Sequence, residues 1–381
     1  MNRYFDNAAT SWPKPACVLQ AVNRVFQEAM GNPGRSNNPE MNRLPFRTRS
    51  LLARLLNVSD SSRVAFGHNA THMINLGIRG LVRQGDRIIT TSMEHNAVSR
   101  PLRYLEKLGI IELVILPCST TGLLDSEDLR HALKQQKTAM VIVNHASNVT
   151  GTVNDLTAIG SIVRDYDAYF MVDCAQTVGA FPIDVEKDCI DVLAGPGHKS
   201  LLGPTGTGFL YVSHRTNPEP LIFGGTGTRS GLDYQPDEMP DCYESGTQNF
   251  HGLAGLEAAL QYIHSRGIAA ITQRKKELCT WVLDGFKNIP GLILYGKTTP
   301  ENRSPVFSVG KKDVDIADIA NALLDDYGII TRTGLHCAPW AHQTAGSYPM
   351  GTVRLSPGLF HTREDIDMMI EAVDSVFRKM K

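Results

Sequence analysis

The sequence has little of what marks proteins that span membranes, bind nucleic acid or depend on disulfides. No uncharged apolar run in its 381 residues approaches the roughly 20 residues of a membrane-spanning helix. Lys and Arg number 38 against 39 Asp and Glu, so the net charge of -1 gives no basic excess for nucleic acid or an anionic membrane. The opening residues, MNRYFDNAATSWPKP, lack the apolar segment of a secretory signal. We therefore expect a cytoplasmic protein with no nucleic-acid or membrane partner.

Paired cysteines are also missing. The seven cysteines are odd in number and scattered, and none of them forms a CxxC pair. This spacing argues against a disulfide framework and against zinc or iron–sulfur ligation, so we expect free thiols, a reducing compartment and no metal site. The residues are Cys17, Cys118, Cys174, Cys189, Cys242, Cys279 and Cys337.

What the sequence does contain, from about residue 60, is a repeated alternation of short apolar runs and longer amphipathic segments. The runs at 139–144 (AMVIVN) and 169–173 (YFMVD) are almost continuously apolar, as in parallel strands that are covered on both faces. Helical patterns at 71–81 and 159–166 lie between such runs. The alternation predicts a doubly wound α/β sheet.

The later part of the chain has a different pattern. Residues 231–249 are irregular and polar, and a long helical pattern then runs from about 252 to 286. It is followed by short strands near 292–295, 305–308 and 329–332, with helices at about 314–325 and 362–380. This part of the sequence predicts a smaller α+β domain.

Two motifs at predicted strand ends carry groups suited to cofactor chemistry. Lys199 stands among small residues in GPGHKS, where burial could turn its amine into a nucleophile. Asp173 ends an apolar strand, and a carboxylate there can pair with a protonated ring nitrogen. Taken alone, a GHK triplet is more often an exposed loop, and Asp173 is as readily a helix cap.

Polar residues also follow the other predicted strands. Ala70 and Thr71 begin a helix, where free N–H groups and a hydroxyl can bind phosphate. His95 and Asn148 each come just after a strand, and a histidine there could stack on a ring or shuttle protons. Each of these residues could also be an ordinary helix cap or solvated loop residue.

A third group lies late in the chain, in TRTGLHCAP at 331–339. Cys337 stands there in a polar loop near Arg332 and His336, and nearby positive charge favours a thiolate. Arg354 ends a predicted short strand and could hold a carboxylate through two hydrogen bonds. A Cys-His pair alone is more often incidental, and Arg354 could instead form a surface ion pair.

No single motif decides the function, but their order and joint occurrence do. FDNAAT, EHN, SNxxG, VDxAQ, GHK, ESGTQN and RTGxHCA follow one another along the chain. In this the chain resembles, over essentially its whole length, the class V aminotransferase-like family of pyridoxal phosphate enzymes, and within it the cysteine desulfurases and selenocysteine lyases. The resemblance implies an α/β, aspartate aminotransferase-like fold of type I, as in PLP-dependent transferases. A large mixed-sheet cofactor domain is expected at 15–250, and a smaller α+β domain at 1–14 and 251–381.

The resemblance implies roles for the residues around the ring of pyridoxal 5'-phosphate. Lys199 would carry the cofactor and later move the Cα proton. Asp173 would pair with the ring nitrogen, Gln176 with the ring oxygen, and His95 would stack on the ring as a further catalytic residue. Asn148 is expected beside the cofactor as well.

The cofactor's phosphate is assigned in the same way to the Ala70 backbone, Thr71 and His198. Thr228 would reach the phosphate of a partner subunit, so the resemblance implies a homodimer. The phosphate turn here reads NATH, where relatives often have Gly or Thr before the threonine and Glu after it. The effect of His72 at that last place is left open by the sequence.

The resemblance also implies how a substrate is handled. Asn148, Arg332 and Arg354 would position its carboxylate, and Cys337 would accept sulfur from L-cysteine, leaving L-alanine and a persulfide. A protein that accepts the sulfur is a further expected partner. A selenocysteine lyase, which yields alanine and selenide, stays open, as does a class V aminotransferase or lyase that does not use Cys337. The complete set of Lys, Asp and Gln disfavours a non-catalytic protein.

Overall fold

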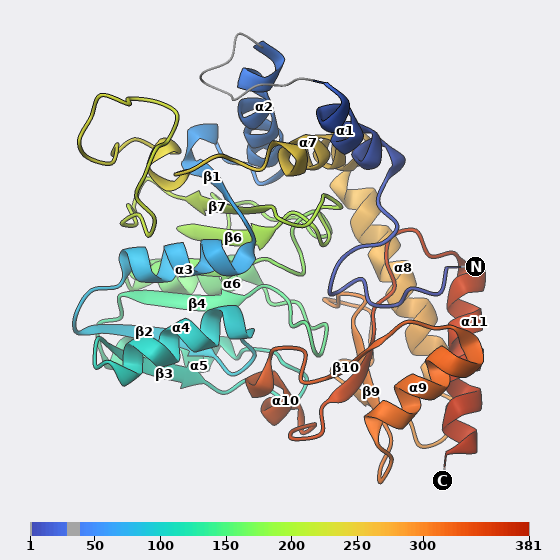
Figure 1. Ribbon diagram of the computed structural model, residues 1–381. Coiled ribbons are helices and arrows are strands. Elements are labelled where there is room, and N and C mark those ends of the chain that lie inside the picture. The colour runs from blue at the N-terminus through green and yellow to red at the C-terminus, as the bar shows by residue number, and fades with distance from the viewer. Residues whose placement is uncertain (1, 29–38, 381) are drawn as a thin grey trace.

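The computed structural model describes residues 2–28 and 39–380, and its centre is a large mixed sheet (Figure 1). The strands of this sheet are β1 (Val64–Gly67), β2 (Asp86–Thr91), β3 (Ile111–Leu116), β4 (Met140–Asn144), β5 (Tyr169–Asp173), β6 (Val192–Pro196) and β7 (Gly208–Val212). Their order across the sheet is β1-β7-β6-β5-β4-β2-β3. The five neighbouring strands β6, β5, β4, β2 and β3 pair in parallel. In this sheet, β7 runs antiparallel to its two neighbours, β1 and β6.

Side chains alternate between the two faces of the large sheet, and both faces are buried. On β4, Val141 and Val143 join one hydrophobic core, whereas Met140 and Ile142 join the other. The second core lies under α3 (Ala70–Leu81) and α4 (Asn96–Lys107). The first lies under α1 (Ala16–Gln27), α2 (Pro39–Leu55), α5 (Ser126–Gln135), α6 (Leu156–Asp165) and α7 (Phe250–Arg266). Burial on both faces explains why these strands are apolar throughout.

A second, four-stranded antiparallel sheet lies beside the first. It comprises β8 (Ile293–Tyr295), β9 (Phe307–Gly310), β10 (Arg332–Gly334) and β11 (Thr352–Leu355), in the order β10-β11-β9-β8. The helices α8 (Ile268–Phe286), α9 (Ile316–Tyr327) and α11 (Arg363–Lys379) pack on it around a separate core (Figure 1). Shorter elements are α10 (Pro339–Ala345) and the 3-10 turns η1 (Ser61–Arg63) and η2 (Asp241–Tyr243).

The N-terminal segment runs along the small sheet before it reaches the large one. Tyr4 bridges to Ile330 and Asp6 to Ser356, while Phe5 is fully buried in the small core. At the predicted domain boundary near residue 250, α7 begins, and this helix packs in the core of the large sheet. The division of the chain at residue 250 stays a prediction. In residues 2–28 and 39–380, no helix has the length and hydropathy needed to cross a membrane.

The structure corrects three expectations about local elements. The single helix expected from 252 to 286 is wrong, because the chain breaks at Gly267, whose φ of 80° ends α7 and precedes α8. That left-handed backbone is one that glycine adopts at little cost. The strand expected at 329–332 shares only Arg332 with β10. The residues after Cys337 form α10, with Pro339 in its first turn, where sequence reasoning had expected no helix.

Candidate active site

The carboxyl ends of four parallel strands meet at one pocket. Because β2, β4, β5 and β6 run in the same direction, the residues that follow them gather at one edge of the sheet. The side chains that sequence reasoning singled out after these strands line one cavity together with the start of α3. They are Ala70, Thr71, His95, Asn148, Asp173, Gln176, His198 and Lys199.

Lys199 follows β6 on a turn that the N-terminal segment holds in place. The carbonyl of the preceding residue, His198, accepts hydrogen bonds from the Lys14 ammonium at 2.7 Å and from the Ser11 amide at 3.1 Å. Burial lowers the pKa of Lys199 to about 8, and the charge of Arg354 acts in the same direction. A much larger fraction of this amine is therefore neutral near pH 7 than of an ordinary lysine. A neutral amine is what nucleophilic attack on a carbonyl requires.

Asp173 ends β5 facing the same pocket. Burial raises the pKa of this carboxyl, while a 2.9 Å hydrogen bond from the Ala175 amide and the charge of Lys199 oppose the rise. An anion held in a buried site gains most from a nearby cation, such as a protonated ring nitrogen. Gln176 lies one turn further on, and its Nε2 atom donates to the carbonyl of Ala8 at 3.1 Å.

His95 is fixed at the N-terminus of α4. Its Nδ1 atom accepts a 3.0 Å hydrogen bond from the Ala97 amide, so a proton on the neutral ring lies on Nε2. Burial lowers the pKa of His95 to about 4, and the charges of Lys199 and Arg332 add to the effect. The imidazole is therefore neutral at physiological pH, and its orientation is set by the helix.

The first turn of α3 offers hydrogen-bond donors to an anion. Asn69 caps this helix by accepting from the His72 amide at 2.9 Å, and Ala70 and Thr71 follow at the pocket. The first amides of a helix have no partner within the helix, and its dipole favours negative charge there. Across the pocket, the Nδ1 atom of His198 is buried and has no partner among the described residues. His72 does not line this pocket; its ring stacks on that of His68.

Arg354 lies beside the pocket rather than on its lining. It is 1% exposed on β11, and it pairs with Asp6 at 2.7 Å and donates to the carbonyl of Asn148 at 3.2 Å. Its Nε atom is buried and lacks a partner within the described chain. Arg332 stands opposite it on β10 and is half-buried.

The Cys337 loop is held from both sides against the large sheet. The carbonyl of Cys337 accepts from the Asn96 amide at 2.7 Å, and the carbonyl of His336 accepts from Nδ2 of Asn148 at 2.8 Å. The thiol itself is exposed, with its Sγ atom 3.5 Å from Nη2 of Arg332. The loop thus places an accessible thiol next to His95, at the edge of the pocket.

The other six thiols are less accessible than Cys337, and none of the seven cysteines is in a disulfide. Burial raises the pKa of Cys118 and of Cys242 to about 11 and that of Cys279 to about 12. It also raises the pKa of Cys174 well above its usual value. Buried thiols of this kind stay protonated and unreactive near pH 7.

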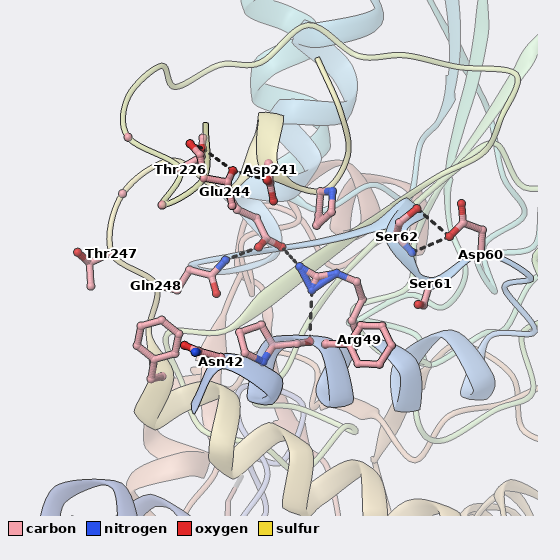
Figure 2. Close-up of a pocket in the computed structure, with 18 residues that line it drawn as sticks. Asn42, Arg49, Asp60, Ser61, Ser62, Thr226, Asp241, Glu244, Thr247 and Gln248 are labelled. Atoms are coloured by element: carbon pink, nitrogen blue, oxygen red, sulfur yellow. Dashed lines mark hydrogen bonds and ion pairs between the residues drawn. The ribbon is translucent and has the colours of Figure 1, made fainter. Parts of the chain in front are cut away.

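Thr228 does not join the Lys199 pocket. It lines a separate cavity of about 690 Å³ between α2 and the segment from 225 to 250. Figure 2 shows the Glu244 carboxylate in this cavity wall between Arg49, at 2.8 Å, and Gln248. The Thr228 hydroxyl is exposed and donates to Asp241. Within this chain Thr228 therefore lines a different cavity from the other predicted cofactor residues.

Glu94 is a buried group near the site that sequence reasoning did not single out. It is fully buried, and its Oε1 atom accepts from the Thr91 hydroxyl at 2.6 Å and from the Asn144 amide at 3.1 Å. Burial raises the pKa of Glu94 to about 8, and the charge of Asp173 adds to the rise. The sequence feature that could have pointed to Glu94 is its position at a strand end, directly before His95.

An α/β fold with a buried lysine at the end of a strand is a general arrangement for enzymes that bind a cofactor through a lysine. Comparison with known proteins shows which family of such enzymes this chain belongs to. Residues 3–369 match the model of the class V aminotransferase family, so the chain belongs to that family, as predicted. The family uses pyridoxal phosphate, and the predicted fold class is also confirmed.

Similar proteins agree on one activity. A probable cysteine desulfurase of Methanothermobacter thermautotrophicus is 32% identical over 98% of this chain and 94% of its own. A cysteine desulfurase of Escherichia coli O157:H7 is 30% identical over 98% of this chain and 93% of its own. Among solved structures, an apo cysteine desulfurase from Thermococcus onnurineus matches with a TM-score of 0.91 and 29% identity, over 99% of this chain and 95% of its own.

Proposed function

We propose that this protein is a pyridoxal phosphate-dependent cysteine desulfurase that converts L-cysteine to L-alanine and forms a persulfide on Cys337. The observation that carries the proposal is the position of the Cys337 thiol. It is exposed, and its backbone is tied to Asn96, the neighbour of His95 in the Lys199 pocket. An aminotransferase has no use for a thiol at this place.

The residues of the pocket fit pyridoxal phosphate. The α3 N-terminus and the unpartnered Nδ1 atom of His198 suit its phosphate, and the buried Asp173 carboxylate suits its ring nitrogen. Lys199 would hold it covalently, Gln176 would face the ring oxygen, and His95 would lie against the ring. When bound, the cofactor withdraws electrons from the Cα atom of an amino acid.

This chain's own groups then supply the remaining chemistry. Lys199, with a pKa of about 8, can accept the Cα proton of the substrate and return one to carbon. Asn148, Arg332 and Arg354 would orient the substrate carboxylate. The Cys337 thiolate attacks the substrate sulfur, the C–S bond breaks, and the S–S bond of the persulfide forms. Cysteine and the Cys337 thiol thus become alanine and the Cys337 persulfide, with atoms balanced and no outside oxidant.

We infer further that the enzyme is a cytoplasmic homodimer that passes its sulfur to an acceptor protein. The segment that carries Thr228 exposes large apolar side chains, which is unusual for a surface that stays in water. They are Leu221, Ile222, Phe223, Leu232 and Tyr234. A partner subunit covering this segment would bring Thr228 toward that subunit's phosphate site. The free state of all seven cysteines suits a reducing compartment.

The test measures alanine, sulfide and selenide with L-cysteine and L-selenocysteine as substrates. Wild type should form alanine and sulfide from cysteine in the presence of a reducing thiol, and Cys337→Ala should lose both products while keeping the visible absorbance of the bound cofactor. Cys189→Ser, a change to a half-buried thiol, is the matched control and should stay active. Full sulfide release by Cys337→Ala, or pyruvate in place of alanine, would contradict the proposal. Turnover of selenocysteine alone would identify a selenocysteine lyase.

A further inference from the structure

A groove on the surface leads away from the Lys199 pocket and ends at Cys337. It has a volume of about 480 Å³ and shares Thr71, His95 and Ala97 with the pocket. Its walls are the solvent-facing sides of α3 and α4, two helices that pack side by side (Figure 1). The groove therefore joins the place where a persulfide would form to open solvent.

The groove has a strongly one-sided charge. On α3, Asn75 and Arg79 stand four residues apart, and on α4 Arg100 and Tyr104 do the same, so each pair lies on one helix face. Among the residues that the structure describes, no aspartate or glutamate lines the groove. Arg79 and Arg100 are exposed, and neither has a carboxylate partner within ion-pair distance in the described part of the chain. Two uncompensated positive charges thus face the groove.

The charge extends to the reacting end of the groove. Arg332 is also without a carboxylate partner among residues 2–28 and 39–380, and it lies 3.5 Å from Cys337 Sγ. Arg100 and Arg332 both contribute to the low pKa of His95, so both act on the field at the pocket edge. Arg103, also on α4, is by contrast paired with Glu106 at 2.6 Å. Positive charge is left open where an outside molecule would meet Cys337.

We propose that this groove binds a second kind of sulfur acceptor beside the acceptor protein inferred above, and that this second acceptor is a small thiol carrying carboxylate groups. The proposal rests on the proposed function, because it presupposes a persulfide on Cys337. The volume lies within the range of small-molecule sites, and exposed cations speed the approach of anions and hold them through screened attraction. The thiol must reach Cys337 while its carboxylates meet Arg79 and Arg100.

The transfer step is a thiol–persulfide exchange. The acceptor thiolate attacks the outer sulfur of the Cys337 persulfide, the S–S bond to Cys337 breaks, and Cys337 leaves as a thiolate. The acceptor becomes the persulfide. No net oxidation or reduction occurs, and the leaving thiolate forms beside the Arg332 guanidinium, which stabilises negative charge on sulfur.

The experiment separates formation of the persulfide from its removal. Holoenzyme is first mixed with L-cysteine alone, and the burst of alanine, one per subunit, reports persulfide formation. Mercaptosuccinate (anionic), 2-mercaptoethanol (neutral) or cysteamine (cationic) is then added, and loss of the Cys337 persulfide is followed by mass spectrometry. Each variant is compared with wild type for the same thiol, so that intrinsic thiol reactivity cancels.

The double variant Arg79→Gln, Arg100→Gln should slow transfer to mercaptosuccinate by about 3- to 10-fold and leave transfer to 2-mercaptoethanol within about 2-fold. Added salt should slow mercaptosuccinate in wild type but hardly in the variant. Arg54→Gln, at an exposed arginine of α2 outside the groove, is the control and should match wild type.

Equal slowing of all three thiols, or no slowing, would overturn the proposal. A slower alanine burst in the double variant would overturn it as well, since the groove would then serve substrate entry. A wild-type enzyme that gives no alanine burst would instead contradict the proposed function itself, so the two failures are distinguishable.

Discussion

The Nη2 atom of Arg332 lies 3.5 Å from the Sγ atom of Cys337, although the two residues belong to a strand and to the loop that follows it. Arg332 stands directly opposite Arg354 in the small sheet, and Asp6 neutralises only Arg354, at 2.7 Å. The charge of Arg332 thus remains available to a sulfur anion. A guanidinium next to a sulfur atom attracts negative charge that forms on that sulfur.

The first prediction concerns this pair. Replacing Arg332 by Gln should slow alkylation of Cys337 by iodoacetamide by about 3- to 10-fold near neutral pH, because the sulfur then lacks the positive charge that lies 3.5 Å from it. Arg332→Lys should retain part of the rate, since it keeps the charge but loses the planar group. The measurement is peptide mass spectrometry of the alkylated loop. An unchanged rate in Arg332→Gln would show that the arginine does not act on the thiol.

The second prediction concerns the pH dependence of cofactor attachment. Burial lowers the pKa of Lys199 to about 8, so half of the amine is neutral at pH 8 and nearly all of it is neutral above about pH 9. The rate at which the cofactor-free protein takes up pyridoxal phosphate should rise up to about pH 9 and then level off, as visible absorbance reports. N-acetyl-lysine, with an ordinary amine, should instead continue to gain rate beyond about pH 9. The same continued rise in the protein would contradict the lowered pKa.

The third prediction concerns stability and Glu94. Burial raises the pKa of its carboxyl from 4.5 to about 8. The unfolded chain therefore releases this proton near pH 4.5 while the folded chain keeps it to about pH 8, so the folded state loses stability as the pH rises between these values. Glu94→Gln keeps the uncharged shape. Its unfolding temperature should equal that of wild type near pH 4.5 and exceed it increasingly up to pH 8.

Thermal unfolding followed by circular dichroism at a series of pH values checks this trend. Glu371→Gln, on the exposed side of α11, is the matched control and should give a difference from wild type that does not change with pH. If Glu94→Gln were less stable than wild type at pH 8, the carboxyl would be ionised in the fold and its contacts with Thr91 and Asn144 would be those of an anion.

The fourth prediction concerns Thr228 and the proposed dimer. Thr228→Ala should weaken cofactor binding by about 10-fold, the effect of one lost hydrogen bond to a charged group. A mixed dimer of one Lys199→Ala subunit and one Thr228→Ala subunit distinguishes the two arrangements. If Thr228 serves the partner's site, one site in the mixed dimer is fully normal and binds cofactor with wild-type affinity. If Thr228 serves the site of its own chain, neither site in the mixed dimer is normal. The mixed dimer then binds the cofactor no more tightly than the Thr228→Ala homodimer does.

Much of this protein could be determined from the sequence by itself. The continuous apolar runs, such as that of β4, predicted a parallel sheet with both faces buried, because only that environment tolerates apolar residues at every position. The order of short motifs around Lys199, Asp173 and Cys337 then indicated the family, since each motif marks a strand end or loop. Each of these features depends on residues that are close together in the chain, so it can be recognised from the sequence alone.

Only the tertiary structure decided what lies next to what. The break at Gly267 was hidden because both adjoining helices have helical periodicity, and only their packing on different cores requires a change of direction. The burial of Glu94 and the placing of Arg332 beside Cys337 arise from the sheet edge and the strand register. The groove of Arg79 and Arg100 likewise needs α3 to pack beside α4. Charge, exposure and pKa depend on distances between segments far apart in the chain, and folding alone sets those distances.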